Sequence, residues 1–452
     1  MKRLIVCMFL AMFAVASAWS ALAQIPSPTA STTFIAGQYV VRDSGGLPGL
    51  NLTCLLLQCT VQEGLGDPAG QLFVITQNNT LDPVLFMNLL LSQQGVLDAE
   101  PDQVLHVMAY TFNEKKTGPP ALYDDTAITY YGGTVIHGYV YQPATSLIRL
   151  ADAQANFNRS GAGIVAVIDT GVDANQPVLK PVLVPGYDFV NNSSSVDETG
   201  DVDQSSMAVL DSSDAEPGYV NQSTMAVLDQ STMAVLDGAQ YAAFGHGTMV
   251  SGVIHLIAPT ARIMPLKAFK ADGTGSLSDV IRAVYFAEIH GAKVLNMSFD
   301  FTSSSFELKS ALDTASTLGM ISVASAGNDG EEVLVYPAAY SNVMGVASTS
   351  NCDELSSFSN YGPGVVWVGA PGEGVITTYP YSTWAAVWGT SFSAPMVSGT
   401  AALLVDVSNG TAVQSTAASA IAHADYINPQ LNHGRLNINT VLEAWSLYIA
   451  PW

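Results

Sequence analysis

The stretch Gly163-Ile-Val-Ala-Val-Ile-Asp169-Thr-Gly-Val-Asp173 decides the fold class of this chain. Residues 164–168 form a continuous run of mainly β-branched side chains, which is typical of a strand buried on both faces of a sheet. Similar runs follow at residues 262–269, 293–298, 320–324, 343–347 and 365–368. Helical patterns lie between several of these runs. This alternation predicts a three-layer α/β domain over residues 146–447, with a parallel sheet between two layers of helices.

Two of the helices can be placed from their end signals. Residues 278–290 carry apolar side chains at helical spacing, and Gly291 follows them as a common helix stop. Ser304-Ser-Phe-Glu307 has the form of a capping box, which predicts a helix that starts there and ends at Gly319.

A smaller domain precedes the α/β domain. Residues 33–108 contain strand-like and helix-like segments in the order β-α-β-β-α-β, and Asp82-Pro83 marks the start of the second helix. This order predicts a ferredoxin-like α+β domain. Residues 109–145 are rich in Gly, Pro and Tyr, so we expect them to form a connector between the two domains.

The composition excludes several classes of protein. The 452 residues include 15 Lys and Arg against 38 Asp and Glu, which gives a net charge of −23, and 48% of the residues are hydrophobic. That apolar content suffices for large cores and excludes a disordered chain. The acidity argues against a nucleic-acid partner, because phosphate contacts need clustered Lys and Arg.

The first residues have the pattern of a secretory signal peptide. Lys2 and Arg3 precede an apolar run over residues 4–15, and Ala21-Leu-Ala23 resembles a cleavage site. We therefore expect residues 1–23 to be removed and the protein to be secreted, either to the periplasm or out of the cell. No later apolar stretch of the sequence is long enough to span a membrane.

Four cysteines are too few for a disulfide scaffold. Cys54 and Cys59 are close in sequence, and two interpretations stay open for them. They form a local disulfide if a helix ends between them, or they are two packed thiols. Cys352 has no His-bearing motif beside it, so we expect an unreactive thiol.

An acidic, Ser-rich insert at residues 191–240 interrupts the α/β pattern. It contains three near copies of the sequence Gln-Ser-Thr-Met-Ala-Val-Leu-Asp, at residues 204–211, 222–229 and 230–237. We interpret it as a duplicated surface excursion in which each copy forms a short strand, with a substrate-rim or binding element as the alternative. Calcium is conceivable at its acidic residues, but their spacing matches no calcium-binding loop.

Four polar residues stand in short motifs that favour nucleophilic chemistry. These motifs are Val165-Ala-Val-Ile-Asp169, Phe244-Gly-His246-Gly, Ser325-Ala-Gly-Asn328 and Gly389-Thr-Ser391. A serine hydroxyl becomes a good nucleophile when an imidazole takes its proton, and a buried carboxylate can hold that imidazole in one tautomer. The Asn328 side chain and the Ser391 backbone N–H are candidate donors for an oxyanion. The set therefore predicts acyl transfer.

These motifs, in the order Asp, His, Asn, Ser, resemble those of the subtilisin-like serine peptidases. The resemblance covers about residues 160–445 and includes Leu431-Asn-His-Gly-Arg-Leu-Asn-Ile438. It implies a secreted serine endopeptidase with the triad Asp169, His246 and Ser391, an acyl-enzyme at Ser391, and Asn328 as the oxyanion donor.

The resemblance also reaches the smaller domain. Residues 33–108, and residues 95–102 most closely, are similar to the family's propeptide, an intramolecular chaperone and inhibitor. The implied partners are protein or peptide substrates and the chain's own propeptide. The resemblance implies no required cofactor and no metal, although calcium stays possible, and we expect a monomer.

Five residues are assigned to substrate binding by the same resemblance: Ser298, Asp300, Ser325, Gly327 and Val335. The sequence departs from the family pattern at Asp300 and Val335, which stand where the family usually has glycine. We therefore expect a restricted S1 pocket with an acidic rim, which favours small or basic side chains at P1.

A second class of function stays open. An exported, autoinhibited or degenerate family member could act as a binding protein, and the repeats and the larger S1 residues are its motivation. The intact set of four chemical groups argues against it. A lipase or esterase of another fold is disfavoured, because the sequence contains no G-x-S-x-G elbow.

Overall fold

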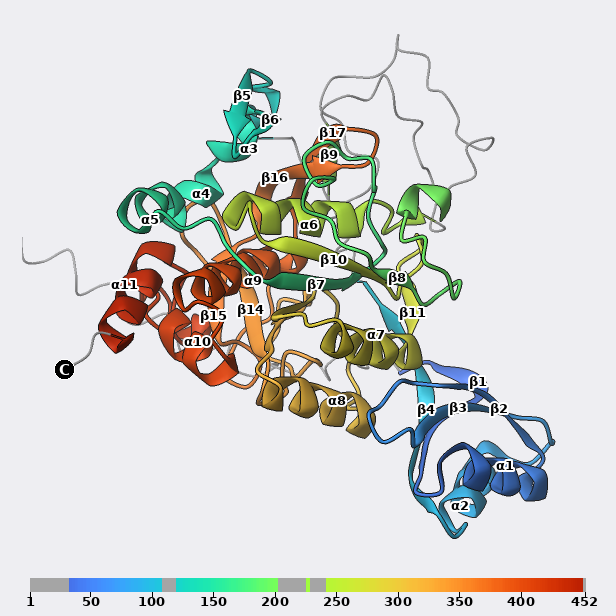
Figure 1. Cartoon of the computed structure of the whole chain (residues 1–452). Coiled ribbons are helices and arrows are strands. Elements are labelled where there is room, and N and C mark those ends of the chain that lie inside the picture. The colour runs from blue at the N-terminus through green and yellow to red at the C-terminus, as the bar shows by residue number, and fades with distance from the viewer. Residues whose placement is uncertain (1–31, 108–118, 202–224, 228–240, 450–452) are drawn as a thin grey trace, which may run out of the picture.

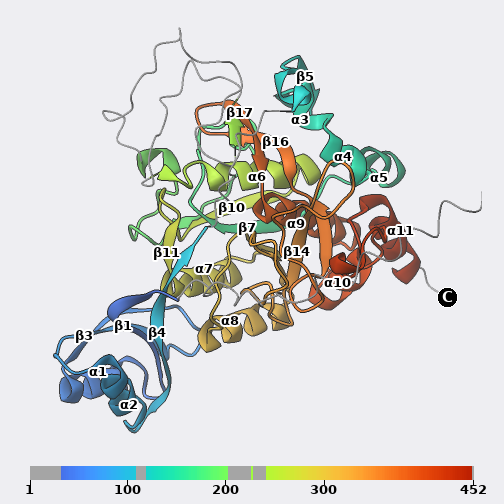
Figure 2. The same ribbon diagram turned by 180° about the vertical axis from the view of Figure 1, so that it is seen from behind.

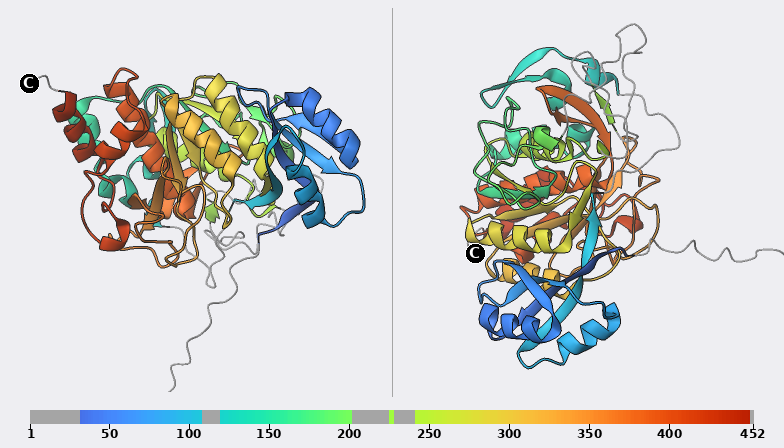
Figure 3. Two further views of the ribbon diagram at one scale, coloured as in Figure 1. Left: turned by 90° about the horizontal axis from the view of Figure 1, so that it is seen from below. Right: turned by 90° about the vertical axis from the view of Figure 1, so that its right-hand side faces the viewer.

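The computed structural model describes residues 32–107, 119–201, 225–227 and 241–449. Residues 32–107 form a small N-terminal domain that packs against a larger α/β domain (Figure 1). The N-terminal domain and the C-terminal helices lie at opposite ends of the molecule (Figure 3). Within the described ranges, no helix combines the length and apolar character needed to cross a membrane.

The larger domain is built on a seven-stranded parallel sheet with the order β15-β14-β13-β12-β7-β10-β8. Its strands are β7 (Ile164–Asp169), β8 (Tyr187–Asp188), β10 (Arg262–Lys267), β12 (Val294–Met297), β13 (Ile321–Ser325), β14 (Met344–Thr349) and β15 (Val368–Pro371). Because the strands are parallel, their carboxyl ends share one edge of the sheet. Asp169, at the end of β7, therefore lies at the same edge as the residues that follow β12 and β13.

Most of the predicted strands are confirmed, and one is displaced. The run at residues 365–368 was expected to be a strand, but β15 begins only at Val368. The N–H groups of Val365 and Val366 both donate to the carbonyl of Gly362, so this part of the run closes a turn instead of joining the sheet.

Helices cover both faces of this sheet, as predicted (Figures 1 and 2). On one face, α6 (His246–Ile257) packs against α9 (Thr390–Val407), and α9 crosses β12 to β15. On the other face, α7 (Leu277–Ile289) packs beside α8 (Phe306–Thr317). The remaining helices of this domain are α3 (His137–Val140), α4 (Pro143–Leu147), α5 (Leu150–Phe157), α10 (Gln414–Ile421) and α11 (Ile438–Ile449).

Helix α8 begins differently from the prediction. Its N-cap is Ser305, whose Oγ accepts from the N–H of Leu308 at 3.0 Å. Glu307 does not fold back onto the helix start, because its carboxylate binds Arg42 of the N-terminal domain. The capping-box prediction is therefore wrong: with Ser305 as the N-cap, Leu308 stands at the third helical position that the box needs, and Glu307 is free to bind Arg42.

The segment predicted as a connector is partly an ordered piece of the larger domain. Residues 119–145 include a 3₁₀ turn (Pro120–Tyr123), β5 (Ala127–Tyr130) and β6 (Gly133–Ile136). Tyr130 and Tyr139 are buried, and their hydroxyls donate to the carbonyls of Leu256 and Gly252 at 2.6 and 2.7 Å. These tyrosines bury their rings and satisfy their hydroxyls on α6. Residues 109–118 of the predicted connector lie outside the described residues.

One of the repeats supplies a strand. β9 (Met225–Val227), within the copy at residues 222–229, pairs antiparallel with β17 (Thr383–Trp388), which pairs in turn with β16 (Glu373–Tyr379). The short strand expected for this copy is confirmed. The other two copies lie outside the described residues.

The N-terminal domain has the predicted element order. β1 (Phe34–Asp43), β2 (Cys59–Gly64), β3 (Leu72–Gln77) and β4 (Val96–His106) form its sheet, with α1 (Gly46–Leu57) and α2 (Pro83–Leu91) packed on it. Cys54 and Cys59 are disulfide-bonded. Helix α1 ends between them, and Gln58 adopts a left-handed conformation with φ 53°. The interpretation as a local disulfide is therefore the one that the structure supports.

The two domains share a sheet and several polar contacts. β4 pairs antiparallel with β11 (Thr274–Ser276) of the larger domain, which makes the N-terminal sheet five-stranded. Arg42 Nε donates to Glu307 at 2.9 Å. Glu100 accepts from the N–H groups of Phe306 and Glu307 at the start of α8, and Asp102 accepts from the N–H and hydroxyl of Ser278 at the start of α7.

Replacing Arg42 by Ala should loosen this interface. The Glu307 side chain is fully buried, so loss of its cation leaves an uncompensated charge, which typically costs about 3–5 kcal/mol. We expect faster hydrogen exchange at β4 and β11. The control is Lys309→Ala, which breaks an exposed pair with Asp313 on the same helix and should cost less than about 1 kcal/mol. Equal exchange in the two variants would contradict the prediction.

Candidate active site

Asp169 and His246 form a hydrogen-bonded pair at the carboxyl edge of the sheet. Asp169 is the last residue of β7 and His246 is the first of α6, and both side chains are buried. His246 Nδ1 lies 2.8 Å from Asp169 Oδ1 and 3.0 Å from Oδ2. His246 Nε2 has no hydrogen-bond partner among the described residues. With Nδ1 donating to the carboxylate, Nε2 carries the lone pair that can accept a proton.

Two glycines allow the strand and the helix to approach this closely. A Cβ on Gly247 would lie 2.0 Å from the Gly171 carbonyl oxygen, and a Cβ on Gly171 would lie 2.5 Å from the Val196 oxygen. Gly171 also has φ +110°, which L side chains rarely adopt. A side chain at residue 247 would push α6 away from the end of β7 and separate His246 from Asp169, and one at residue 171 would displace Val196 and Glu198.

Ser391 lies in the first turn of α9 beside the residue that follows β12. Its hydroxyl donates to the Ser298 carbonyl at 3.3 Å, and the Ser298 hydroxyl donates to the Ser391 carbonyl at 2.9 Å. The His246 ring lies 5.3 Å from the ring of Phe392, so the imidazole faces the start of α9. The Ser391 hydroxyl points to Ser298 here and not to Nε2. Catalytic hydrogen bonds are often long before substrate binds.

Asn328 is held next to Ser391 by the start of the same helix. Its Oδ1 accepts from the N–H and the hydroxyl of Thr390 at 2.9 and 3.0 Å. These two bonds fix the plane of the Asn328 amide, and its Nδ2 makes no hydrogen bond to a described residue. Nδ2 and the N–H of Ser391 are thus two available donors beside the serine.

The residues predicted to bind substrate surround this point. Ser298 touches Ser391, and the Ser325 hydroxyl donates to the Phe299 carbonyl at 3.4 Å. A Cβ on Gly327 would lie 3.2 Å from Asp300 Oδ2, so Asp300 borders the turn that carries Asn328. Val335 differs: it is 1% exposed and packs in the core. Its side chain therefore presents almost no surface to a substrate.

Asp300 is a buried carboxyl group with no hydrogen bond to a described residue. It is 7% exposed. Burial, with a smaller contribution from the nearby Asp329, raises its pKa to about 7. A cation placed beside Asp300 would therefore stabilise its ionised form.

Sequence reasoning missed Glu198 as part of the site. It was assigned to the acidic insert, but it is 1% exposed and lies behind Asp169, hydrogen-bonded to Thr170 and Thr248. Among the described residues, no three His, Cys, Asp or Glu side chains gather closely enough to hold a metal ion.

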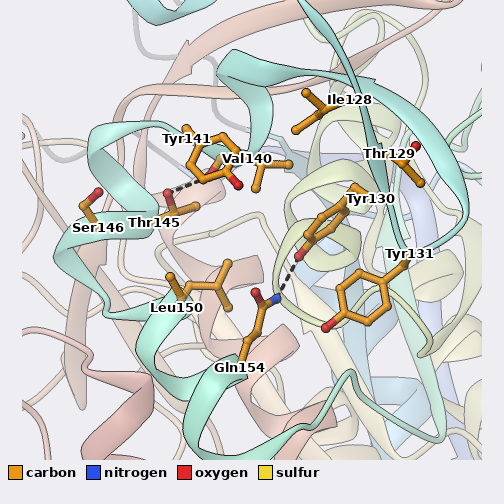
Figure 4. A pocket seen from close by; sticks show the side chains of 11 residues that line it. Ile128, Thr129, Tyr130, Tyr131, Val140, Tyr141, Thr145, Ser146, Leu150 and Gln154 are labelled. Atoms are coloured by element: carbon orange, nitrogen blue, oxygen red, sulfur yellow. Dashed lines mark hydrogen bonds between the residues drawn. The ribbon is translucent and has the colours of Figure 1, made fainter.

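A separate cavity of about 420 Å³ lies among β5, α4 and α5. Tyr130 and Tyr131 lie on one side of it, and Tyr141 and Thr145 lie on the other (Figure 4). None of the predicted site residues lines it, so it is distinct from the site at the sheet edge.

Comparison with known proteins identifies the family of this chain. The model of the Subtilase family matches residues 161–434. The chain belongs to the subtilase family. This subtilase is 32% identical over 272 residues to the thermophilic serine proteinase of Bacillus sp. (strain AK1), a match that covers 60% of this chain and 58% of that protein. It is 35% identical over 269 residues to thermitase of Thermoactinomyces vulgaris, covering 60% of this chain and 83% of that protein.

A solved structure with the same fold is fervidolysin from Fervidobacterium pennivorans, described as a keratinolytic enzyme related to subtilisin. The TM-score is 0.66 at 20% identity, and the match covers 92% of this subtilase and 62% of that chain. At this identity the likeness shows the fold alone. The subtilase thus spans 58% of the length of the proteinase from strain AK1 and 62% of fervidolysin.

Replacing Asn328 by Ala should lower kcat by roughly 10²–10³ and change KM little, because a side-chain oxyanion donor acts only in the transition state. Asn328→Asp is the matched variant. It keeps an acceptor for Thr390 but has no Nδ2 donor, so it should lose activity as well. Steady-state kinetics on a peptide substrate measures both. A wild-type kcat in Asn328→Asp would rule out the donor role.

Proposed function

We propose that this subtilase is a secreted serine endopeptidase made as a self-processing precursor. The observation that carries the proposal is the buried Asp169–His246 hydrogen bond, with Nε2 left open, beside the serine at the start of α9. Residues 1–23 would be the signal peptide, and residues 33–108 would be the propeptide. The mature enzyme would act on protein substrates as a monomer.

The geometry supports a two-step hydrolysis. Ser391 Oγ attacks the carbonyl carbon of the scissile bond while His246 Nε2 takes its proton, and the same proton then goes to the leaving amine. Water repeats these steps on the acyl-enzyme, so Ser391 recovers its proton and the acid product leaves. Asp169 keeps the imidazole in one tautomer and stabilises the imidazolium. Asn328 Nδ2 and the N–H of Ser391 would bind the oxyanion.

The end of the N-terminal domain supports a role as propeptide. β4 runs along β11, and the N–H of Val107 donates to the Gly273 carbonyl at 2.9 Å. His106 forms an antiparallel bridge with Asp300, two residues beyond Ser298. The last described residues of the N-terminal domain therefore pair with β11 and with Asp300, the segments that we assign to substrate binding, and there they would compete with other peptides.

This register also suggests which bond is cleaved first. In an antiparallel pair, one step forward on one strand matches one step back on the other. The Ser298 carbonyl, which accepts from Ser391 Oγ, lies two residues before Asp300, so a peptide that continued this pairing would bring the bond after its second residue beyond His106 to the serine. We therefore propose cleavage between Met108 and Ala109, which lie outside the described residues.

Wild type beside Ser391→Ala tests this function. Wild type should shorten to a fragment with Ala109 at its N-terminus and should then cleave casein, whereas Ser391→Ala should do neither. Mass spectrometry and N-terminal sequencing follow the first event, and a fluorophosphonate label follows the serine. If both proteins stay full length, inert and unlabelled, the endopeptidase proposal fails and the autoinhibited binding protein becomes the better explanation.

Asp300 should favour a basic side chain at P1 in substrates added in trans. Because its pKa is about 7, we expect the preference for Lys over Met to be larger at pH 8.5 than at pH 5.5, where the carboxyl group is protonated. Asp300→Asn should lower kcat/KM for Lys by about tenfold or more and leave Ala at P1 unchanged. A P1-varied peptide library measures this, and a clear preference for Phe in the wild type would refute it.

The Met at residue 108 does not conflict with that preference. Its cleavage is intramolecular, and a tethered substrate reaches a high effective concentration at the site. Self-processing therefore tolerates a side chain that a free substrate would carry at a disadvantage.

A further inference from the structure

A buried carboxylate outside the proposed triad joins the strand and the helix that carry Asp169 and His246. Glu198 is 1% exposed and lies in the 3₁₀ turn Glu198–Asp201, just before the repeats. Its Oε1 accepts from the N–H of Thr248 at 3.1 Å and also binds the Thr248 hydroxyl. Its Oε2 accepts from the Thr170 hydroxyl at 2.7 Å.

These contacts satisfy the start of the helix that begins with His246. Gly245, the N-cap of α6, has no side chain to offer, so the first N–H groups of α6 depend on other residues. Glu198 accepts one of them from Thr248, and Thr170 Oγ1 accepts another from Gly247 at 3.0 Å. A negative carboxylate is also favoured at the positive end of a helix. Glu198 thus acts as a cap supplied from another segment.

The Thr170 hydroxyl has one proton and two carboxylates within reach. It lies 2.7 Å from Glu198 Oε2 and 3.3 Å from Asp169 Oδ1. When Glu198 is ionised, the shorter contact takes the proton, and Asp169 keeps its negative charge for His246. When Glu198 is neutral, it can donate to Thr170, and the Thr170 proton can turn to Asp169.

We propose that Glu198 is a positioning residue for the triad: it ties the end of β7 to the first turn of α6 and directs the Thr170 proton away from Asp169. This inference rests on the proposed function, because it assigns a supporting role to a residue behind Asp169. It goes beyond the triad, because Glu198 belongs to the segment that precedes the repeats and yet helps to fix the relative positions of Asp169 and His246.

The charges around Glu198 make its ionisation sensitive to pH. The titratable groups that interact with it are Asp169 of β7, Lys267 of β10, and Tyr379 and Tyr381 near the end of β16. Next to these groups lie His246 of α6, Asp173 after β7, and Asp197 and Asp201 of its own segment. Burial raises the pKa of Glu198 to about 7, against its hydrogen bonds from Thr248 and Thr170 and the charge of Lys267.

Glu198→Gln is the first test, because glutamine keeps the size but fixes the neutral state. With no negative charge behind Asp169 and the Thr170 proton turned toward it, the imidazolium of His246 is less stabilised. We expect the acid limb of kcat/KM to move to lower pH by about half a unit or more. Glu198→Ala, which also removes the cap, should lower kcat by roughly 10²-fold with little change in KM.

Thr170 supplies a second, independent pair of variants. Thr170→Val removes the hydroxyl that joins Glu198, Asp169 and Gly247, and it should lower kcat as Glu198→Ala does. Thr170→Ser restores the hydroxyl and should recover activity to within about threefold of wild type. The matched control is Glu288→Gln, since Glu288 is another glutamate whose pKa is raised to about 7 by burial, at the far end of α7. Its acid limb should equal that of wild type.

A measurement without turnover separates this inference from the proposed function. In the full chain carrying Ser391→Ala, with ¹³C-labelled histidine, the His246 pKa should be lower by about half a unit when Glu198→Gln is added. An unchanged His246 pKa and acid limb in a folded Glu198→Gln variant would overturn the proposal. So would Thr170→Ser being as defective as Thr170→Val, or a Glu198→Ala loss seen in KM alone. If wild type itself is inert, the histidine titration still decides.

Discussion

The site depends on how closely the first turn of α6 approaches the end of β7. The Asp169–His246 hydrogen bond needs two elements, far apart in sequence, to meet within 2.8 Å at their side chains. Gly247 and Gly171 remove the steric obstacle, since a methyl group on Gly247 would overlap the Gly171 carbonyl. Glu198 and Thr170 then accept hydrogen bonds from the N–H groups in the first turn of α6 that have no partner within the helix. The close approach of α6 to β7 and the hydrogen bonding of its first N–H groups must therefore be achieved together. The glycines allow the approach, and Glu198 and Thr170 supply the acceptors.

The features that could be predicted from the sequence are those that leave a local signal in it. Asp169 could be placed at a sheet edge because a buried parallel strand leaves a local signal, and the four polar motifs are local as well. Glu307 was misread because Ser304 and Ser305 are equally good N-cap residues by type, and because its actual partner, Arg42, is 265 residues away in sequence. Glu198 was hidden for the same reason: an acidic residue in a Ser-rich insert carries no local mark of burial.

Tyr130 and Tyr139 show a different limit. Composition placed them in a connector, because tyrosine with Gly and Pro is common in irregular segments. Their rings are buried, and each hydroxyl finds a carbonyl on α6. The polar edge of a tyrosine allows burial without the strict apolar periodicity from which a core is predicted. Val335 was likewise expected to line a pocket, and its side chain is in the core instead.

The acidic excess of the chain has a structural use that the net charge does not reveal. Asp102 and Glu198 are buried and Glu100 is half-buried, and each lies at the first turn of a helix, where N–H groups need acceptors. At the interface, burial raises the pKa of Glu100 from 4.5 to about 7 and that of Asp102 from 3.8 to about 6.

A raised pKa in the docked state means that docking takes up protons between the free and docked values. Contact between the domains is therefore strongest below about pH 4 and weakens progressively as the pH rises toward 6 to 7, where these carboxyl groups are ionised in the docked state too. The same rise ionises Asp300 and Glu198. The interface carboxyl groups Glu100 and Asp102 thus favour contact between the domains less in the pH range where Asp300 and Glu198 gain their charge. A neutral or alkaline medium therefore weakens the contact between the domains and, over the same pH range, ionises the carboxyl groups near the proposed triad.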